Sequence, residues 1–423
     1  MQHRIPSGEH GPRGEVMAHA IEACVHCGFC LPACPTYAVL GEEMDSPRGR
    51  IFLMKEVLEG SLPLDDATPY VDRCLGCVAC ETACPSGVEY GELLTSFRAH
   101  AEPRRVRSLG DRLLRAMVLG TLPYPRRLRQ ALRVARRLRW LAPALPRRVR
   151  AMLELAPGRL PDAGPQVPEA VVPAVGPRRA RVAVLVGCAQ RVLAPEIHAA
   201  TVRVLARNGV EVVVPPAQGC CGALSLHAGA ERQAARFAAR TLDVFARDVD
   251  AVITDAAGCG SGMKEYALLL RGSEREDDAR RFAGLVQDIA SFLDELGIIA
   301  PAGFDKPLRV AYHDACHLLH AQRVREAPRR LLGAIPGVEL LEPANAERCC
   351  GSAGTYNIEE PEIARELGEQ KARALAATRA DLVAAGNIGC IAQLRACLPR
   401  IGATLEVRHT IEVLDRAYAG DVA

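Results

Sequence analysis

Cysteine is the residue type in this sequence whose number and spacing point most directly to chemistry. The chain has 423 residues, and 17 of them are cysteines. The first eight form two runs with one shared spacing, Cys-x2-Cys-x2-Cys-x3-Cys-Pro, which are Cys24, Cys27, Cys30, Cys34 and Cys74, Cys77, Cys80, Cys84. This spacing is typical of bacterial ferredoxin sites that hold a pair of [4Fe–4S] clusters.

In such a run, three closely spaced thiolates ligate one cluster and the fourth cysteine, which precedes a proline, ligates the other. The predicted ligands are therefore Cys24, Cys27, Cys30 and Cys84 for the first cluster, and Cys74, Cys77, Cys80 and Cys34 for the second. Zinc is the alternative metal, but it prefers two Cys-x-x-Cys pairs on separate loops. The doubled run favours two iron–sulfur clusters, which indicates an electron relay.

The segment between the two runs, Pro47–Gly60, is predicted to be helical because a proline opens it and a glycine closes it. A helical insertion between the runs is similar to the cluster domain of succinate dehydrogenase iron–sulfur subunits. We therefore expect residues 1–100 to form an α-helical dicluster ferredoxin domain.

Eight of the nine remaining cysteines form a second kind of repeat. Each copy has a single cysteine, then after 31 or 32 residues a Cys-Cys-Gly triplet, then after 36 or 38 residues a last cysteine. The first copy holds Cys188, Cys220, Cys221 and Cys259, and the second holds Cys316, Cys349, Cys350 and Cys390. Such a recurrence indicates an internal duplication, which we assign to residues 178–300 and 301–423.

Short apolar runs alternate with helix-length segments in both copies. Strands are predicted at Arg181–Val186, Val210–Val214, Ala251–Asp255, Leu308–Tyr312, Val338–Leu341 and Asp381–Ala384. Helices are predicted at Ala230–Arg247 and Ile358–Thr378. Each copy is therefore predicted to be a βαβαβ unit with a parallel sheet. Cysteines that follow strands gather at the carboxyl edge of such a sheet, so each set can converge.

A ferredoxin domain followed by two Cys-Cys-Gly repeats resembles a known family of iron–sulfur subunits. The matching segments are Gly219–Leu224, Tyr312–Leu318, Arg348–Ile358 and Gly386–Cys390. The family includes subunits of glycolate oxidase, anaerobic glycerol-3-phosphate dehydrogenase, lactate utilisation systems and heterodisulfide reductase (B and D), and the single-chain fusion looks most like glycolate oxidase. The resemblance implies a multidomain α+β protein, in which the α-helical ferredoxin precedes a duplicated α/β Cys-Cys-Gly domain.

The family motif ends each repeat with Cys-x-x-Cys, and both repeats here depart from it. The first ends Cys259-Gly-Ser-Gly262, and the second ends Asn387-Ile-Gly-Cys390. The loss weakens a disulfide-cleaving role, but four thiolates still suffice for an iron–sulfur cluster. Two interpretations stay open for the eight repeat cysteines, namely one or two further clusters, or small buried residues beside turns at Gly222 and Gly351.

Four histidines lie near these motifs or near a late strand, namely His227, His313, His317 and His409. Each could orient a thiolate, supply a missing ligand or shuttle a proton, but a structural histidine is the favoured interpretation for each one.

Positive charge is concentrated between Pro103 and Arg150, where fifteen arginines accompany a single acid, Asp111. This segment is predicted to form amphipathic helices that contact an anionic membrane surface or an acidic partner, or that simply face solvent. We expect no nucleic-acid binding, because no nucleic-acid fold accompanies the charge. A proline-rich linker follows at Ala156–Pro177, so residues 101–177 are predicted to connect the ferredoxin domain to the repeats.

The sequence has no secretory leader and no apolar run long enough to cross a bilayer, so we expect a cytoplasmic protein, with peripheral contact at the inner face of the membrane left open. By resemblance, a flavin-binding dehydrogenase subunit would oxidise glycolate with FAD, and this chain would pass the electrons towards a quinone or another acceptor. No catalytic residue is expected on this chain. The alternatives are a subunit serving lactate or glycerol-3-phosphate, a heterodisulfide-reductase-like subunit, and a metal-bound scaffold without redox turnover.

Overall fold

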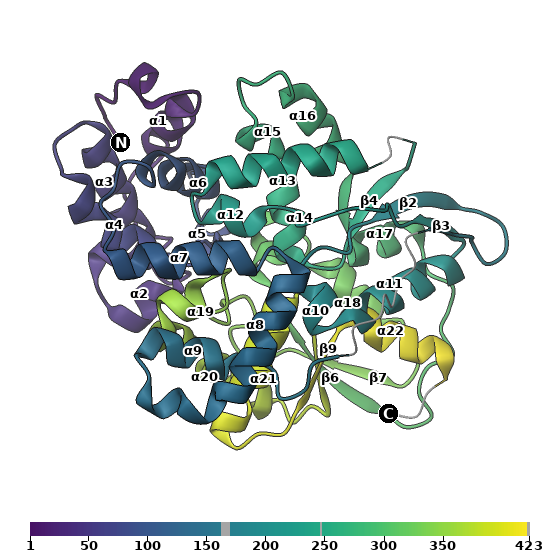
Figure 1. Ribbon diagram of the computed structural model, residues 1–423. Helices are drawn as coiled ribbons and strands as arrows, with labels where there is room; N and C mark the ends of the chain where they lie inside the picture. The colour runs from purple at the N-terminus through teal and green to yellow at the C-terminus, as the bar shows by residue number, and fades with distance from the viewer. Residues whose placement is uncertain (162–169, 246–247, 421–423) are drawn as a thin grey trace.

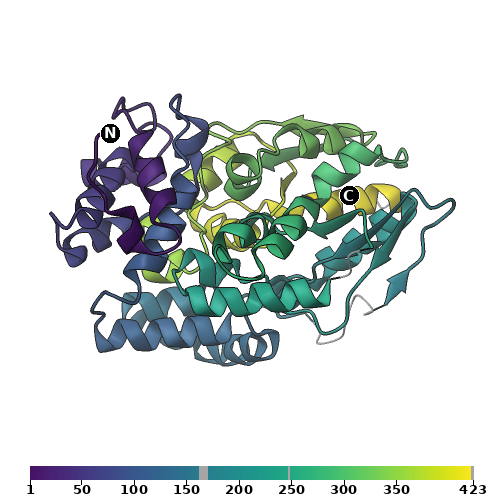
Figure 2. The same ribbon diagram turned by 90° about the horizontal axis from the view of Figure 1, so that it is seen from above.

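The structure is a computed structural model that describes residues 1–161, 170–245 and 248–420. Residues 1–161 form helices and loops without a strand. The first six helices are α1 (Gly14–Glu22), α2 (Pro35–Leu40), α3 (Pro47–Leu58), α4 (Leu64–Asp72), α5 (Ala79–Thr82) and α6 (Tyr90–Ala101). They surround the two cysteine runs at one end of the molecule, drawn in purple and dark blue (Figures 1 and 2).

Helix α3 begins where the sequence predicts. The hydroxyl of Ser46 accepts a hydrogen bond from the amide of Gly49 at 3.0 Å, and Pro47 takes the first helical position. Both features are common at helix starts, since a side-chain cap satisfies a free amide and proline lacks one. The helix ends at Leu58, two residues before the predicted end at Gly60.

The arginine-rich segment forms α7 (Leu109–Thr121), α8 (Pro125–Leu138), the short helix η3 (Arg139–Ala144) and α9 (Arg147–Glu154). In both views these blue helices lie along one side of the molecule (Figures 1 and 2). The linker that follows is partly structured, because β1 (Val171–Val172) pairs antiparallel with a strand of the first repeat. Residues 162–169 of the predicted linker lie outside the described residues.

Each repeat is built on a parallel sheet of four strands. The strands are β2 (Ala180–Val184), β3 (Val210–Val213), β4 (Ala251–Thr254) and β5 (Val286–Asp288), then β6 (Leu308–His313), β7 (Val338–Leu341), β8 (Leu382–Ala385) and β9 (Glu406–His409). The spatial orders are β3-β2-β4-β5, with β1 at its edge, and β7-β6-β8-β9. The prediction of three strands in each repeat was wrong, because β5 and β9 are short and lack the apolar run that marked the others.

The helices of the repeats surround these sheets. The first repeat has α10 (Gln190–Leu193), α11 (Pro195–Arg207), α12 (Ala223–His227), α13 (Glu231–Val244), α14 (Ala257–Lys264), α15 (Tyr266–Leu269), α16 (Glu276–Leu285) and α17 (Ile289–Leu296). The second has η4 (His317–Ala321), α18 (Glu326–Gly333), α19 (Tyr356–Glu359), α20 (Pro361–Ala377), α21 (Ile388–Cys397), η5 (Pro399–Ile401) and α22 (Thr410–Ala419). The helix predicted over Ile358–Thr378 is divided before Pro361, because the residue that precedes a proline disfavours helical backbone angles.

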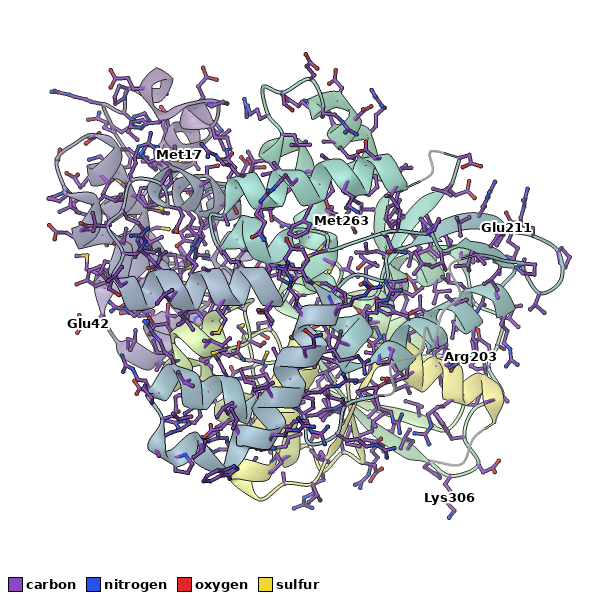
Figure 3. The ribbon with its side chains drawn as sticks, in the orientation of Figure 1. Met17, Glu42, Arg203, Glu211, Met263 and Lys306 are labelled. Atoms are coloured by element: carbon purple, nitrogen blue, oxygen red, sulfur yellow. The ribbon has the colours of Figure 1, made fainter. Side chains whose placement is uncertain are left out.

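The two repeats share one hydrophobic core. Helix α11 packs on α22, and α17 packs on α18, so each repeat contributes the helices that follow its first and last parallel strands. Apolar side chains of both sheets belong to the same buried cluster, for example Val184 and Ile253 with Val310 and Val383. Figure 3 shows the side chains on the ribbon, with Met263 in the first repeat and Met17 in the ferredoxin part, both fully buried, and Lys306 at the rim. The shared core therefore fixes the position of the carboxyl edge of one sheet relative to that of the other.

Candidate metal centres

The first predicted set of thiols comes together near the surface of the ferredoxin part. Cys24, Cys27 and Cys30 line one cavity together with Cys84 from the second run. Cys27 is exposed, and the neighbouring Phe29 has 68% of its surface exposed. This set therefore lies where a partner protein can approach it closely.

The second predicted set lies deeper. Cys34, from the first run, lines a cavity with Cys74, Cys77 and Cys80, and all four side chains are buried. Cys80 borders both cavities, so the two sets are neighbours. Burial raises the pKa values of Cys77 and Cys80 well above that of an ordinary thiol. Buried thiols that resist ionisation fit a metal site, because metal coordination drives off the proton.

A buried arginine, Arg50 of α3, supplies positive charge beside the second set. Only 1% of its surface is exposed, and its guanidinium donates to Asp45 Oδ1 and Thr36 Oγ1, both at 3.0 Å. Asp45 also accepts two hydrogen bonds at 2.9 Å from Arg73. The triad of two arginines and one aspartate carries a net positive charge next to Cys34, whose sulfur lies 3.9 Å from Arg50 Nη1.

Positive charge also acts on the thiol of Cys74. Burial alone would raise the pKa of this thiol, but Arg50 and Arg98 outweigh burial and lower it. The phenol of Tyr90 also donates to Cys74 Sγ at 3.5 Å. The sequence reasoning missed Arg50 and Tyr90. The sequence feature that could have revealed them is a charged residue and a phenol on the otherwise apolar faces of helices next to the cysteine runs.

The thiols of the first repeat also converge. Cys188 follows β2, and its sulfur lies 3.5 Å from that of Cys220. The second cysteine of the pair, Cys221, has a pKa well below its ordinary value because Cys220 and Cys259 donate hydrogen bonds to it. The four predicted thiols thus form one connected group at the carboxyl edge of the sheet, as expected for residues that follow parallel strands.

The second repeat reproduces this arrangement and adds a histidine. Cys316 Sγ lies 3.9 Å from Cys349 Sγ. Cys350 has a pKa well below its ordinary value, because Cys349 and Cys390 donate hydrogen bonds to it. His313, the last residue of β6, lies beside Cys350 and Cys390, and the ligand atoms of these three residues are all within 4.8 Å of one another.

The strand registers show which residues of the two repeats are equivalent. Ala180 pairs with Val210 in the first sheet, as Leu308 pairs with Val338 in the second. The offset between Ala180 and Leu308 makes Cys188 equivalent to Cys316, and Leu185 equivalent to His313.

The same comparison applies to the last cysteine of each repeat. Val182 pairs with Ala251, and Val310 pairs with Leu382. Cys259 and Cys390 are therefore equivalent, and each is the third residue of its helix, α14 or α21. Each repeat therefore has its last cysteine at the same structural position, although the two sequence segments suggest different positions of the Cys-x-x-Cys motif.

The other three histidines singled out by sequence lie elsewhere. His227 Nε2 lies 3.2 Å from Glu265, and its ring packs edge-on against that of His317. His317 contacts Ser261 Oγ at 2.7 Å and donates to the carbonyl of Gly76 at 3.0 Å. His409 caps α22, because its Nδ1 accepts from the amide of Ile411 at 3.1 Å. His313 alone of the four forms a close group with two thiols among the described residues, although the charge of His227 also helps to lower the pKa of Cys221.

The chain matches two known domain families. A "4Fe-4S dicluster domain" matches residues 20–88, and a "Cysteine-rich domain" matches twice, over residues 182–264 and 310–395. A Bacillus subtilis protein named "Probable glycolate oxidase iron-sulfur subunit" is 38% identical over 92% of each chain. The Escherichia coli glycolate oxidase iron-sulfur subunit is 38% identical over 94% of each chain. This chain belongs to the family of glycolate oxidase iron–sulfur subunits.

Shorter relatives match part of the chain. The lactate utilization protein A of Geobacillus thermodenitrificans is 30% identical over 56% of this chain and 98% of its own length. In family terms, the present chain is an iron–sulfur protein with a dicluster ferredoxin domain followed by two cysteine-rich domains. Among the described residues, no helix is long and apolar enough to cross a bilayer.

One further contact relates the two kinds of domain. Cys77 and Leu75 of the second ferredoxin run belong to the same buried cluster as Cys316 and Cys349 of the second repeat. The first repeat's Cys220 and Cys221 lie in a different cluster, which contains no ferredoxin residue among those described. The second repeat of this glycolate oxidase family member therefore adjoins the buried ferredoxin site directly.

Proposed function

We propose that this chain is the electron-transfer subunit of a flavin-dependent dehydrogenase that oxidises a 2-hydroxy acid, and that the acid is glycolate. A partner subunit would hold FAD and take two electrons and two protons from glycolate to give glyoxylate. The observation that carries the proposal is the interleaving of the eight ferredoxin thiols into two adjacent sets, one that reaches the surface at Cys27 and one that is buried. Such a pair can accept electrons at the surface and pass them inward.

The residues of the chain suit each end of this relay. When bound, [4Fe–4S] clusters accept and release single electrons, which divides the two-electron output of a flavin into single steps. Cys24, Cys27, Cys30 and Cys84 would hold the first cluster, and Cys74, Cys77, Cys80 and Cys34 the second. Exposed Cys27 and Phe29 offer a contact for the flavin subunit, while Arg50 offsets negative charge at the buried site.

We propose further that the repeats hold iron–sulfur groups. The donor sets are Cys188, Cys220, Cys221 and Cys259 in the first repeat, and Cys316, Cys349, Cys350 and Cys390 in the second. In support, one cysteine of each adjacent pair has a pKa well below its ordinary value, and two of the four thiols in the first set and all four in the second are buried. A thiolate in such a place is costly without a cation, because burial disfavours charge.

Two relatives support glycolate over lactate as the substrate of the complex. The relatives named for glycolate oxidase match over 92% and 94% of this chain, and the lactate utilization relative over 56%. The chain itself would hold no substrate, so its partner's specificity is the quantity to measure. Glycolate should reduce the flavin of the purified complex at least tenfold faster than lactate does.

The acceptor proposed is a membrane quinone, reached from the cytoplasmic face. Support comes from the side of the molecule formed by α7 to η3. Val106, Leu109 and Leu113 are 72% or more exposed, as is Trp140. Arg133, Arg136, Arg137 and Arg139 are exposed nearby and form no ion pair with another described residue. Exposed apolar side chains among arginines suit a surface of anionic lipid.

Vesicle binding tests this contact. The complex should sediment with vesicles that contain phosphatidylglycerol, and not with pure phosphatidylcholine vesicles. Replacing Leu113 and Trp140 by serine should weaken sedimentation at least tenfold, because about 1.5–3 kcal/mol is lost for each large apolar side chain. Equal binding of the variant would overturn the membrane contact and leave the electron relay untouched.

Electron transfer within the complex tests the main proposal. In Cys27→Ser, glycolate should still reduce the flavin at the normal rate, while quinone reduction should fall at least tenfold. Cys397→Ser is the matched control, since Cys397 is a buried cysteine outside both runs and both repeat motifs, and its activity should stay unchanged. The proposal is overturned if the flavin subunit alone reduces quinone as fast as the whole complex.

A further inference from the structure

His313 is a fully buried histidine beside the thiol of Cys350, whose pKa it helps to lower. Among the described residues, neither Nδ1 nor Nε2 has a partner at good hydrogen-bond geometry. A buried polar group that lacks a partner costs about 1–3 kcal/mol. Such an unsatisfied group in a native protein calls for an explanation, for example a bound ion.

The surroundings of His313 indicate what that function is. Its ligand nitrogen and the sulfurs of Cys350 and Cys390 are mutually within 4.8 Å, and all three side chains are buried. Asn387 donates its amide to Cys390 Sγ at 3.5 Å, which fixes that thiol towards the group. Three donors this close together can bind a single metal atom, because metal–sulfur and metal–nitrogen bonds of about 2.0–2.3 Å place ligand atoms within 5 Å of each other.

The first repeat shows that packing does not demand a histidine here. The equivalent residue, Leu185, is 2% exposed and lies in the apolar core of its repeat. The same backbone position therefore accepts leucine in the first repeat, in a cluster that also contains Cys220 and Cys221. The second repeat has an imidazole where the first has an apolar side chain, and this imidazole lies beside two thiols.

We propose that His313 is a nitrogen ligand to one iron of the iron–sulfur group in the second repeat. It would act beside Cys350 and Cys390, and Cys316 and Cys349 would complete the donor set. The first repeat would then be bound by thiolates alone. This inference rests on the proposal that the repeats hold iron–sulfur groups.

A mixed donor set has a consequence for electron flow. A neutral imidazole at this position gives the centre a higher reduction potential than a thiolate at the same position would. The second repeat adjoins the buried ferredoxin thiols through Cys316, Cys349 and Cys77. A histidine-ligated centre at this place would therefore lie next to the buried ferredoxin site on the path of the electrons.

Pulsed electron paramagnetic resonance of the reduced, full-length protein tests the assignment, with histidine labelled by nitrogen-15. The natural chain should contain a centre with strong coupling to one labelled nitrogen. His313→Leu, which installs the residue of the first repeat, should lose that coupling, and so should His313→Cys. His100→Leu, in helix α6 and away from the thiols of the repeats, should retain it. His313→Cys should keep its iron and lower the potential of that centre, which separates ligand exchange from a failure to fold.

Several outcomes would overturn the assignment. Coupling that persists in His313→Leu would overturn it. Iron well above the ~8 atoms of two cubanes, without any histidine coupling, would also overturn it and would leave the proposed function intact. Iron of only ~8 atoms without such coupling would overturn the clusters of the repeats and this assignment together. One equivalent of zinc that disappears in His313→Leu would overturn the assignment to iron.

Discussion

At the scale of single residues, the charges around the buried ferredoxin thiols decide how easily that site accepts an electron. Arg50 is enclosed by Thr36, Asp45 and the carbonyl of Tyr70, to which it donates at 2.7 Å. Its pKa is raised because the neighbouring thiolates of Cys74 and Cys34 and the carboxylate of Asp45 outweigh the opposing effect of burial. The arginine therefore stays charged at every working pH, next to a site whose negative charge grows on reduction.

We expect Arg50→Gln to lower the reduction potential of the buried ferredoxin cluster. A charge about 8 Å away contributes about 2 kcal/mol at an effective dielectric constant of 20. The shift should therefore be on the order of 50 mV or more, measured by a redox titration followed by electron paramagnetic resonance. Lys55→Gln is the control, because Lys55 lies on the same helix and pairs with Glu56 and Glu59. Equal potentials in both variants would contradict this electrostatic role.

Asp288 has a pKa raised to about 7, first because it is buried and also because Asp255 is near. In the unfolded chain this carboxyl has a pKa of about 3.9. Between these values the folded state binds more protons than the unfolded one, so the contribution of Asp288 to stability is complete at low pH and is lost as the pH rises from about 4 through 7.

Asp288→Asn should therefore stabilise the protein more at pH 8 than at pH 5. The amide keeps an oxygen that can accept from the amide of Ala290, as Asp288 does at 2.8 Å, and it never ionises. The expected difference in unfolding free energy between the two pH values is a few kcal/mol at most, about 1.4 kcal/mol for each unit of pKa. Denaturant titrations of both proteins at the two pH values measure it. A pH-independent effect of the substitution would contradict the raised pKa.

At the scale of elements, the Cys-Cys-Gly turn places two thiols at the edge of each sheet. Gly222 and Gly351 have φ angles of 84° and 83°, a region that only glycine adopts readily. Both glycines also lie against the second helix after the turn, α13 or α20. A Cβ on Gly222 would lie 3.2 Å from the carbonyl oxygen of Ala234, and one on Gly351 would collide with that of Ala364.

Gly351→Ala should destabilise the protein by about 3 kcal/mol or more. The cost combines strained backbone angles with the collision against helix α20. Gly402→Ala provides the comparison, because Gly402 has a φ of 75° with nothing within 4 Å of an added Cβ. That variant should lose only about 1 kcal/mol. Denaturant unfolding of the iron-loaded proteins measures both, and equal losses would show that the approach of α20 does not matter.

At the scale of the whole molecule, the ferredoxin part is fastened to both repeats. Arg98 of α6 donates to the carbonyls of Cys74 at 2.6 Å and Val71 at 3.0 Å, and also to the carbonyl of His227 in the first repeat at 3.0 Å. The phenol of Tyr356, in the second repeat, donates to the carbonyl of Arg73 at 2.9 Å. The backbone at the start of the second cysteine run is thus hydrogen-bonded to α6 and to the second repeat, and α6 is hydrogen-bonded to the first repeat.

Arg98→Met should loosen this attachment. Three charge-assisted hydrogen bonds disappear, and the unfolding free energy should fall by about 3 kcal/mol. Hydrogen exchange should also quicken in residues 71–77 and 227–229, which the arginine joins. Arg104→Met is the control, since exposed Arg104 donates at 2.7 Å to the carbonyl of His100, only four residues earlier in the chain. Unchanged exchange in both segments would contradict the role given to Arg98.

The spacing of the cysteines predicts both ferredoxin thiol sets, and each set lines one cavity in the structure. Such a prediction can be made because residues two or three positions apart have little freedom, so the type and spacing of donors restrict the site. The duplication was also visible in the sequence, because it repeats intervals as well as residues. The two short strands β5 and β9 were missed, because three or four residues without an apolar run carry too weak a pattern.

Relations between distant segments were decided by the tertiary structure. Sequence alone treated His227, His313, His317 and His409 alike, and strand register brings His313 to Cys350 and Cys390, 37 and 77 positions further along the chain. Register likewise makes Cys259 and Cys390 equivalent, and the packing of Cys77 with Cys316 and Cys349 brings the second repeat next to the ferredoxin site. The physical reason is that local spacing restricts neighbours along the chain, whereas contacts between segments depend on how sheets and helices bury their apolar faces together.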